Sequence, residues 1–205
     1  MTQQQAVGAP ERVSGAPDWQ QYARWVPALL AVVLAAAALA LLVSNRAPAE
    51  GSPEVRFARD MAAHHDQAVE MAIFMRDRTA DPDLRIFALD IMLTQQGQIG
   101  QMQGWLAAWG RSQAGRESPM AGHGEHMGMA TAAQVADLGR LPVAEAEVAF
   151  LRLMIRHHEG GIAMARDALE ETRRPEVVRL ASSIVSGQES EIAFMRELLG
   201  RRGVQ

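Results

Sequence analysis

Four of the six histidines form two adjacent pairs, and each pair has methionines on both sides at similar spacing. The pairs lie in FARDMAAHHDQAVEMA, residues 57–72, and in FLRLMIRHHEGGIAMA, residues 150–165. The histidines and flanking methionines are His64, His65, Met61 and Met71 in the first segment and His157, His158, Met154 and Met164 in the second. Imidazole and thioether donors without cysteine thiolates favour a soft cation, which among biological metals means Cu(I), with Cu(II) tolerated through the imidazoles.

Helical spacing decides which of these donors share a face. Residues three, four and seven apart lie on one face of an α-helix, so Met61, a paired histidine and Met71 can line one stripe. Adjacent residues point about 100° apart, so the two histidines of a pair do not aim at one point. The spacing leaves open which one faces inward. Further candidate ligands are Met102, Met195 and the carboxylate of Asp60.

A structural explanation of these residues competes with metal binding. Methionines at helical spacing commonly fill gaps in a hydrophobic core, so on their own they are weak evidence for a site. Histidines are stronger evidence, because burying four imidazoles without hydrogen-bond partners is costly. The recurrence of the pair strengthens the metal interpretation, although a duplicated structural feature would also recur.

A second group of candidate ligands lies in the glycine-rich segment MAGHGEHMGM, residues 120–129. It comprises Met120, His123, His126, Met127 and Met129. Core packing does not easily explain methionines in a segment without helical periodicity, since loops lie at the surface. We expect an accessory metal-collecting loop of lower affinity, because binding must order the chain. A linker of accidental composition is the alternative.

Local signals for helix starts organise the chain around these residues. Prolines that can occupy the first helical position are Pro53, Pro82, Pro142 and Pro175. They delimit two hairpins, 54–110 and 131–200, joined by the loop 111–130. The second half repeats the first at an offset of 93 residues without a gap. One hairpin cannot bury its apolar stripe alone, so we predict an all-α four-helix bundle over 54–200, built from two duplicated hairpins.

The N-terminal part has a different composition. Residues 1–24 are polar and contain no periodicity, which predicts a disordered tail. Residues 26–43 carry no charge, and at about 1.5 Å per residue this run is close to the hydrocarbon thickness of a bilayer. We predict one transmembrane helix over 25–44 that contacts the membrane through 26–43, followed by a linker over 45–53. Cleavage of a signal peptide near Ala49 is the alternative.

Composition and missing motifs exclude several classes of function. The net charge of −4 argues against nucleic-acid binding, which normally requires a basic face. The chain has no Ser-His-Asp arrangement and no glycine-rich phosphate loop, so we expect a non-enzymatic protein. A ferritin-type di-iron site uses Glu-x-x-His motifs, and their absence from the sequence disfavours iron carboxylate chemistry.

The motifs DMxxHHxQAxxMA at 60–72 and LMIRHHEGGIAMA at 153–165 resemble the domain-of-unknown-function family number 305. The resemblance covers about residues 54–200 and implies a ferritin-like bundle in an exported or anchored bacterial protein associated with copper. It implies that the paired histidines, with Met61, Met71, Met154 and Met164, are ligands. Leu153 stands where the first copy has Asp60, so the two half-sites are not chemically equal. Gly161 stands opposite Ala68, a small-for-small exchange that we expect to have no effect.

The leading hypothesis is a single-pass, membrane-tethered copper-binding protein with its bundle outside the cytoplasm. It would sequester Cu(I) or hand it to a copper-transfer partner protein. Two alternatives stay open at this point. One is a redox or oxygen-binding metalloprotein with iron or copper in the bundle. The other is a structural bundle whose histidines respond to pH.

Overall fold

The computed structural model describes residues 22–44, 46–114 and 127–204. These residues form six helices and no strand, which confirms the predicted all-α class. The helices are α2 (Val26–Ser44), α3 (Pro53–Arg78), α4 (Pro82–Ala108), α5 (Ala132–Arg140), α6 (Val143–Glu171) and α7 (Pro175–Arg201). The chain divides into two compact units, residues 1–46 and 47–205.

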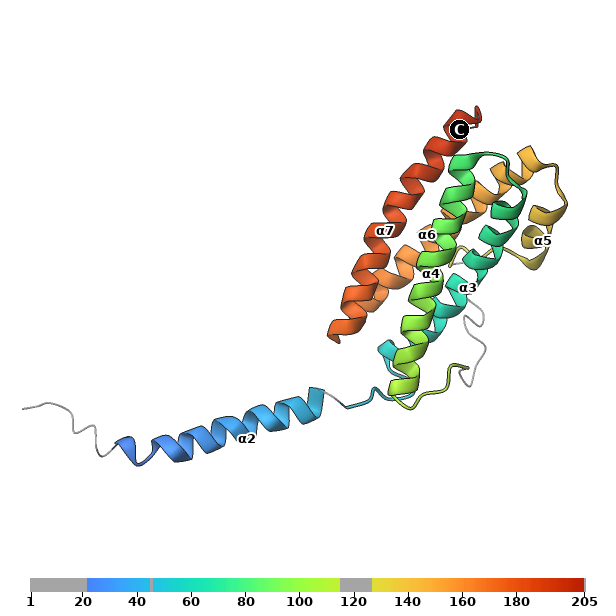
Figure 1. The fold of residues 1–205 in the computed structure, drawn as a ribbon. Helices are drawn as coiled ribbons and strands as arrows, with labels where there is room; N and C mark the ends of the chain where they lie inside the picture. The colour runs from blue at the N-terminus through green and yellow to red at the C-terminus, as the bar shows by residue number, and fades with distance from the viewer. Residues whose placement is uncertain (1–21, 45, 115–126, 205) are drawn as a thin grey trace, which may run out of the picture. The chain divides into compact units, whose positions relative to one another are not determined.

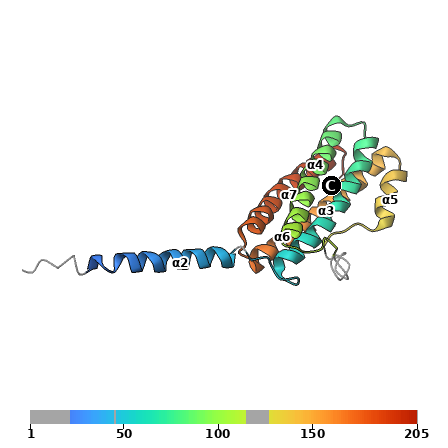
Figure 2. The ribbon, with the colours of Figure 1, turned by 60° about the horizontal axis from the view of Figure 1, so that its bottom comes forward.

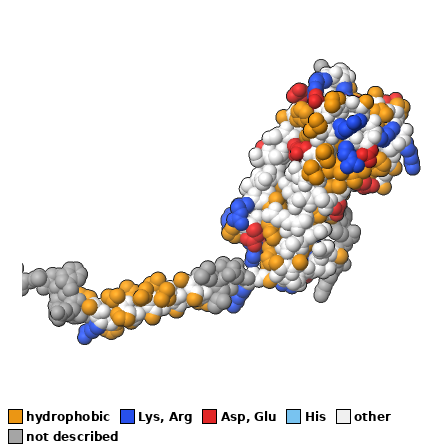
Figure 3. All heavy atoms as spheres, viewed as in Figure 1, with side chains coloured by type: hydrophobic (Ala, Val, Ile, Leu, Met, Phe, Trp, Pro, Cys, Tyr) orange, Lys and Arg blue, Asp and Glu red, His pale blue; other side chains and the backbone are white. Residues whose placement is uncertain are grey.

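Helix α2 is the helix of the first unit. Its described apolar side chains, Leu29 and Val32 among them, are exposed along the helix (Figure 3). Within the described ranges, no helix has both the length and the apolar character needed to cross a membrane. The prediction of a transmembrane anchor over 25–44 is therefore not supported by the structure.

Three helices of the second unit, α3, α4 and α5, begin at residues whose side chains cap them. Ser52 accepts a hydrogen bond from the backbone N–H of Val55 at the start of α3. Asp81 accepts from two backbone N–H groups at the start of α4. Thr131 and Gln134 form a reciprocal capping box at the start of α5. Each cap satisfies N–H groups that have no partner inside the helix, which fixes where the helix begins.

The four long helices pack as two antiparallel hairpins, α3 with α4 and α6 with α7 (Figures 1 and 2). The hairpins contact each other mainly through α3 and α6, and α5 packs on the same two helices. The turn of each hairpin bonds to the N-terminal part of the first helix of the other, because Thr79 donates to Glu147 and Thr172 donates to Glu54. Both pairs follow the 93-residue offset, while the duplication itself stays a prediction from the sequence.

Buried apolar side chains in this unit form two clusters rather than one. The methionines divide between them: Met71, Met154 and Met195 belong to one cluster, and Met61, Met102 and Met164 to the other. Along α3 and α6 the histidine pairs lie between these methionines in sequence. The bundle therefore has polar residues at the height where its two apolar clusters meet.

The other two helices contribute to the same level of the bundle. On α4, Gln95 lies between Ile91 of one cluster and Ile99 of the other. On α7, Gln188 occupies the matching position. We call these residues the polar layer: His64, His65, Gln95, His157, His158 and Gln188, each at most 4% exposed.

Candidate metal-binding site

All four paired histidines are fully buried, with 0% exposure. The rings of His64 and His157 stack where α3 meets α6, with centroids 3.7 Å apart and planes inclined by 30°. Within each pair the ring centroids are 6.2 Å apart. The sequence predicts that one histidine of each pair faces inward, and these two are His64 and His157.

The central histidines donate hydrogen bonds to backbone carbonyls. His64 Nε2 lies 3.0 Å from the carbonyl oxygen of Met127, and His157 Nε2 lies 2.9 Å from that of His64. A carbonyl oxygen can only accept, so the proton of each ring is on Nε2. Both central imidazoles are thereby held in one tautomer and one orientation.

The outer histidines donate to side chains of the neighbouring helices. His65 Nε2 lies 2.7 Å from Oε1 of Gln98 on α4. His158 Nε2 lies 2.6 Å from Oε2 of Glu191 on α7. The two contacts occupy matching positions, but one acceptor is a neutral amide and the other a carboxylate. A carboxylate acceptor makes the imidazole more electron-rich and hence a better metal ligand, so the two pairs are not equivalent.

The second ring nitrogen, Nδ1, has no hydrogen-bond partner in any of the four histidines, and all four of these atoms are buried. Since Nε2 carries the proton, each Nδ1 has a free lone pair. Buried polar atoms are nearly always paired, so four orphaned lone pairs at one level of a bundle need an explanation. Metal-binding histidines have this arrangement, with one nitrogen on the metal and the other donating to an oxygen.

Burial keeps three of the imidazoles, those of His64, His65 and His157, neutral. It lowers the pKa of His64 to about 4, against the smaller opposing effect of the Met127 carbonyl. Burial and the neighbouring His64 lower the pKa of His65 to about 3. The pKa of His157 is also well below the usual value, first through burial and then through the other three histidines. At neutral pH protons therefore do not compete for the Nδ1 atoms of these three rings.

The hydrogen bonds predict one neutral tautomer for the three rings whose pKa burial lowers. In the metal-free protein at pH 7, His64, His65 and His157 should be protonated at Nε2 and unprotonated at Nδ1. Long-range ¹H–¹⁵N correlation spectra distinguish the two neutral tautomers directly. His123 and His126 lie outside the described residues and provide internal references. A paired histidine with its proton on Nδ1 would contradict the assignment.

The predicted thioether ligands lie on both sides of the polar layer. Met61, Met71, Met102, Met154 and Met195 are fully buried, and Met164 is 7% exposed. They do not gather in one cluster, so the six sulfurs do not form a single common site. Among the described residues, no group of three or more His, Asp or Glu side chains is arranged to hold a metal ion.

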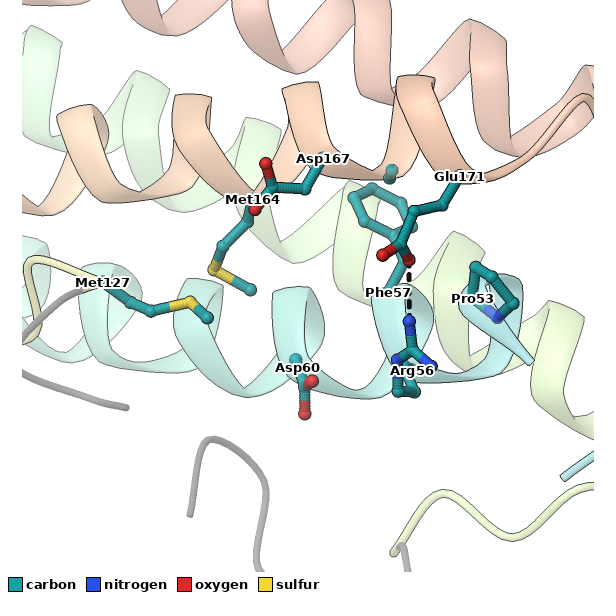
Figure 4. Close-up of a pocket in the computed structure, with 9 residues that line it drawn as sticks. Pro53, Arg56, Phe57, Asp60, Met127, Met164, Asp167 and Glu171 are labelled. Atoms are coloured by element: carbon teal, nitrogen blue, oxygen red, sulfur yellow. Dashed lines mark hydrogen bonds and ion pairs between the residues drawn. The ribbon is translucent and has the colours of Figure 1, made fainter. Parts of the chain in front are cut away.

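Asp60 does not belong to the polar layer. It is half-buried and lines a surface pocket of about 150 Å³, together with Met164 and Met127 (Figure 4). The ion pair of Arg56 and Glu171, 2.7 Å long, lies at another side of the same pocket. The predicted carboxylate ligand is thus next to two thioethers rather than next to the imidazoles.

The predicted metal-collecting loop is described only at its C-terminal end. Met120, His123 and His126 lie outside the described residues, whereas Met127 and Met129 lie inside them. The backbone of Met127 contacts the site, since its carbonyl accepts from His64. Gln67 anchors the chain just beyond, because its amide both donates to and accepts from the backbone of Ala130.

Two glycines make the close approach of this loop end to α6 possible. A Cβ atom on Gly160 would lie only 1.8 Å from the carbonyl oxygen of Met127. Gly128 has φ +70°, and a Cβ there would lie 2.1 Å from the carbonyl oxygen of Arg156. Only glycine fits either position, so these residues keep the Met127 carbonyl within reach of His64.

An alanine at Gly161, the residue opposite Ala68, would require the end of the Gln188 side chain to shift. A Cβ on Gly161 would lie 2.5 Å from Oε1 of Gln188 and 3.2 Å from Cε1 of His64. The position faces the polar layer, where side chains of α3 and α7 fill the space that a methyl group would need. Sequence comparison of the two halves does not reveal this, because it registers only that both residues are small.

Sequence reasoning missed four residues that complete the site. Gln98 and Glu191 orient the outer histidines, and Gln95 and Gln188 contribute buried amides whose nitrogen and oxygen atoms have no partner. A signal was present, since Gln95 and Gln188 are polar residues at matching positions within apolar helical stripes. Gln98 and Glu191 each follow the second histidine of a pair by 33 residues.

Comparison with known proteins agrees with this architecture. The profile of the family described as Domain of unknown function (DUF305) matches residues 54–199. A DUF305 protein from Streptomyces coelicolor, described as a candidate secreted protein, is 45% identical with a TM-score of 0.72, covering 77% of this chain and 98% of that chain. A DUF305 fragment from Deinococcus radiodurans is 44% identical with a TM-score of 0.68, covering 76% and 99%.

A third similar structure is CopM. Its Cu(II)-bound form is 27% identical with a TM-score of 0.63, covering 73% of this chain and 97% of that chain. Its Ag-bound form, obtained by co-crystallization, is 25% identical with a TM-score of 0.54, covering 71% and 93%. No curated protein matches the sequence significantly. The family match extends over most of the chain, and the protein belongs to the DUF305 family.

Proposed function

We propose that this protein binds copper at the polar layer and stores it or passes it on outside the cytoplasm. The observation that carries the proposal is the set of four buried Nδ1 lone pairs without partners. In each ring the opposite nitrogen already donates to an oxygen, so the lone pair is oriented before any ligand arrives. The ligands would be Nδ1 atoms of the paired histidines together with thioethers from the two methionine clusters.

The donor types favour Cu(I). Thioether sulfur is a soft ligand that contributes little to Zn(II) or to hard cations, and imidazole suits both oxidation states of copper. The likeness to CopM supports a copper-associated role at the level of the family, since CopM has been solved with Cu(II) and with Ag. Monovalent silver is a soft cation like Cu(I), and we expect this protein to bind it at the same residues.

A location outside the cytoplasm rests on a separate argument. The Streptomyces relative is described as a candidate secreted protein, and this chain covers 98% of it at 45% identity. The chain contains no cysteine, so its ligand set does not depend on a reducing compartment. Thioether and imidazole ligands remain functional under oxidising conditions, in which thiolates form disulfides.

A competition titration tests the binding site. We expect the full-length, metal-free protein to take Cu(I) from a chromophoric chelator under anaerobic conditions. Replacing all four paired histidines by glutamine should weaken Cu(I) binding at least about 100-fold, because losing one second-shell partner alone typically weakens metal binding 10- to 100-fold. Glutamine keeps a polar side chain of similar length in the layer. Circular dichroism and thermal melting establish whether the variant folds.

The matched control is the double variant His123→Gln, His126→Gln. It removes the same number of imidazoles from the loop as either pair contributes, and we expect it to keep the tight site. If the fourfold variant folds and binds Cu(I) as tightly as the wild type, the assignment to the polar layer is wrong. If only the loop variant loses affinity, the tight site is in the loop.

A further inference from the structure

A second, smaller pocket of about 80 Å³ lies between α4 and α7, on the opposite side of the bundle helices from the α3–α6 contact. At its mouth are exposed residues of both helices, Thr94 and Gly187. Its lining also includes Gln95 and Gln188 of the polar layer. The pocket therefore reaches from the surface to the two glutamines of the polar layer, although none of the paired histidines lines it. We call it the amide pocket.

The deep lining of the amide pocket has unused hydrogen-bonding capacity. The side chains of Gln95 and Gln188 are 2% and 4% exposed, and neither the nitrogen nor the oxygen of either amide has a partner. Burying two amides without hydrogen-bond partners costs free energy of folding, unless a polar molecule or an ion contacts them. Their oxygens can replace water molecules around a cation that leaves the solvent.

The walls of the amide pocket are the side chains that hold the outer histidines. Gln98 and Glu191 both line it, and they accept the hydrogen bonds of His65 and His158. Glu191 is 17% exposed, so its negative charge is only partly screened by water. A cation in the pocket would be attracted by this carboxylate and would lie beside the residues that orient two imidazoles.

The larger pocket beside Met127 is not an equivalent route. None of the polar-layer residues lines it, and its lining includes the Arg56–Glu171 ion pair. Its thioethers, from Met127 and Met164, are on the α3–α6 side of the bundle (Figure 4). Of these two pockets, the amide pocket is the one that reaches polar-layer side chains.

We infer that the amide pocket is the passage through which a soft monovalent cation, Cu(I) or Ag(I), enters and leaves the polar layer. Glu191 attracts the ion at the entrance, and the amide oxygens of Gln95 and Gln188 contact it on its way to the imidazoles. This inference rests on the proposed function, because it assumes that the layer binds metal. It adds a path and names the residues that control how fast the metal enters and leaves.

Binding kinetics test the passage. To measure the association rate, full-length protein is mixed rapidly with Cu(I), and a chromophoric chelator captures the remaining free metal after varied delays. To measure the dissociation rate, the Cu(I)-loaded protein is diluted into chelator. A Cβ on Gly187 meets no atom within 4 Å, so a leucine can be placed there without a clash of its Cβ. In Gly187→Leu the larger side chain should block the opening of the amide pocket. We expect association and dissociation to slow by the same factor, about tenfold or more, with Kd unchanged. A passage serves both directions, so blocking it cannot change the equilibrium.

Two further variants make the test specific. Gly97→Leu is the matched control, because Gly97 is also exposed on a helix with nothing within 4 Å of its Cβ, but it does not line the pocket. It should leave both rate constants unchanged. Glu191→Gln keeps a hydrogen-bond acceptor for His158 and removes the charge. It should slow association several-fold at low salt and flatten the salt dependence of the rate.

The outcomes separate this inference from the proposed function. If the wild type binds Cu(I) and both Gly187→Leu and Glu191→Gln leave its rate constants unchanged, the passage is refuted and copper binding stands. If Gly187→Leu changes Kd without matched changes in both rates, the residue affects the bound state and the passage is likewise refuted. If the wild type binds no Cu(I), the proposed function fails and the passage fails with it.

Discussion

The metal-free protein should lose several kcal/mol of stability between about pH 6.5 and pH 4. In the folded state burial lowers the pKa of His64 to about 4 and that of His65 to about 3, while the unfolded chain titrates near the usual value of 6.5. Within this window the unfolded state binds more protons than the folded state, so acid favours unfolding. The stabilising effect of the neutral imidazoles is complete above pH 6.5 and disappears as the pH falls.

The expected size follows from linkage. Each histidine that protonates only on unfolding lowers the free energy of unfolding by about 1.4 kcal/mol per pH unit. Small domains have a total stability of roughly 5–15 kcal/mol, so two or three such groups remove a large part of it by pH 4. Urea denaturation at pH 7, 6 and 5, with metal removed by a chelator, measures the slope.

The control for this prediction is His65→Gln. It removes one titrating group, so the slope of stability against pH should fall by about 1.4 kcal/mol per unit, whatever the variant loses at pH 7. Stability that does not change between pH 7 and pH 5 in the wild type would mean that the histidines are solvated. A slope that His65→Gln does not alter would assign the pH dependence to other groups.

The second large effect is expected for Gly160→Ala. The added methyl group would lie 1.8 Å from the carbonyl oxygen of Met127 and 2.3 Å from its carbonyl carbon, so the loop backbone must move away from α6. We expect a loss of about 1–3 kcal/mol, the range typical of overpacked positions that force a backbone shift. His64 would lose the acceptor for its Nε2 proton, so its tautomer should become mixed.

Gly100→Ala is the matched control for that substitution. Gly100 is exposed on α4, and a Cβ there meets nothing within 4 Å. Replacing glycine by alanine within a helix normally stabilises it by about 0.5–1 kcal/mol. Chemical denaturation should therefore show opposite changes in stability for the two variants. The ¹⁵N shifts of His64 should report a mixed tautomer only in Gly160→Ala. Equal stability of the two variants would show that the loop end does not pack on Gly160.

Local features of the fold follow from the sequence, whereas contacts between distant segments do not. The helix starts at Ser52, Asp81 and Thr131 are predictable because a capping side chain acts on its own first turn. The burial of both histidines in each pair is not, because it depends on acceptors that other helices supply. The burial of His65, for example, depends on Gln98 of α4, whose side-chain oxygen accepts the hydrogen bond from Nε2.

The role of the loop was the least predictable part of the site. Its composition directs attention to the sulfur and imidazole groups, yet a backbone carbonyl of Met127 makes the contact with His64. No residue type encodes a carbonyl contact of this kind. Its traces in the sequence are Gly128 and Gly160, whose missing side chains admit the close contact, and glycines alone do not identify what packs against them.

Side-chain contacts join α4 and α7 at both ends of the two helices. At one end the caps of the two helices form an ion pair, Arg202 with Asp81 at 2.6 Å. At the other end the guanidinium of Arg174 lies over the ring of Trp109, 5.3 Å from its centroid. The middle parts of α4 and α7, which line the amide pocket, thus lie between two ends that are held in contact. Metal exchange through this pocket, as inferred above, would require only these middle parts to move apart.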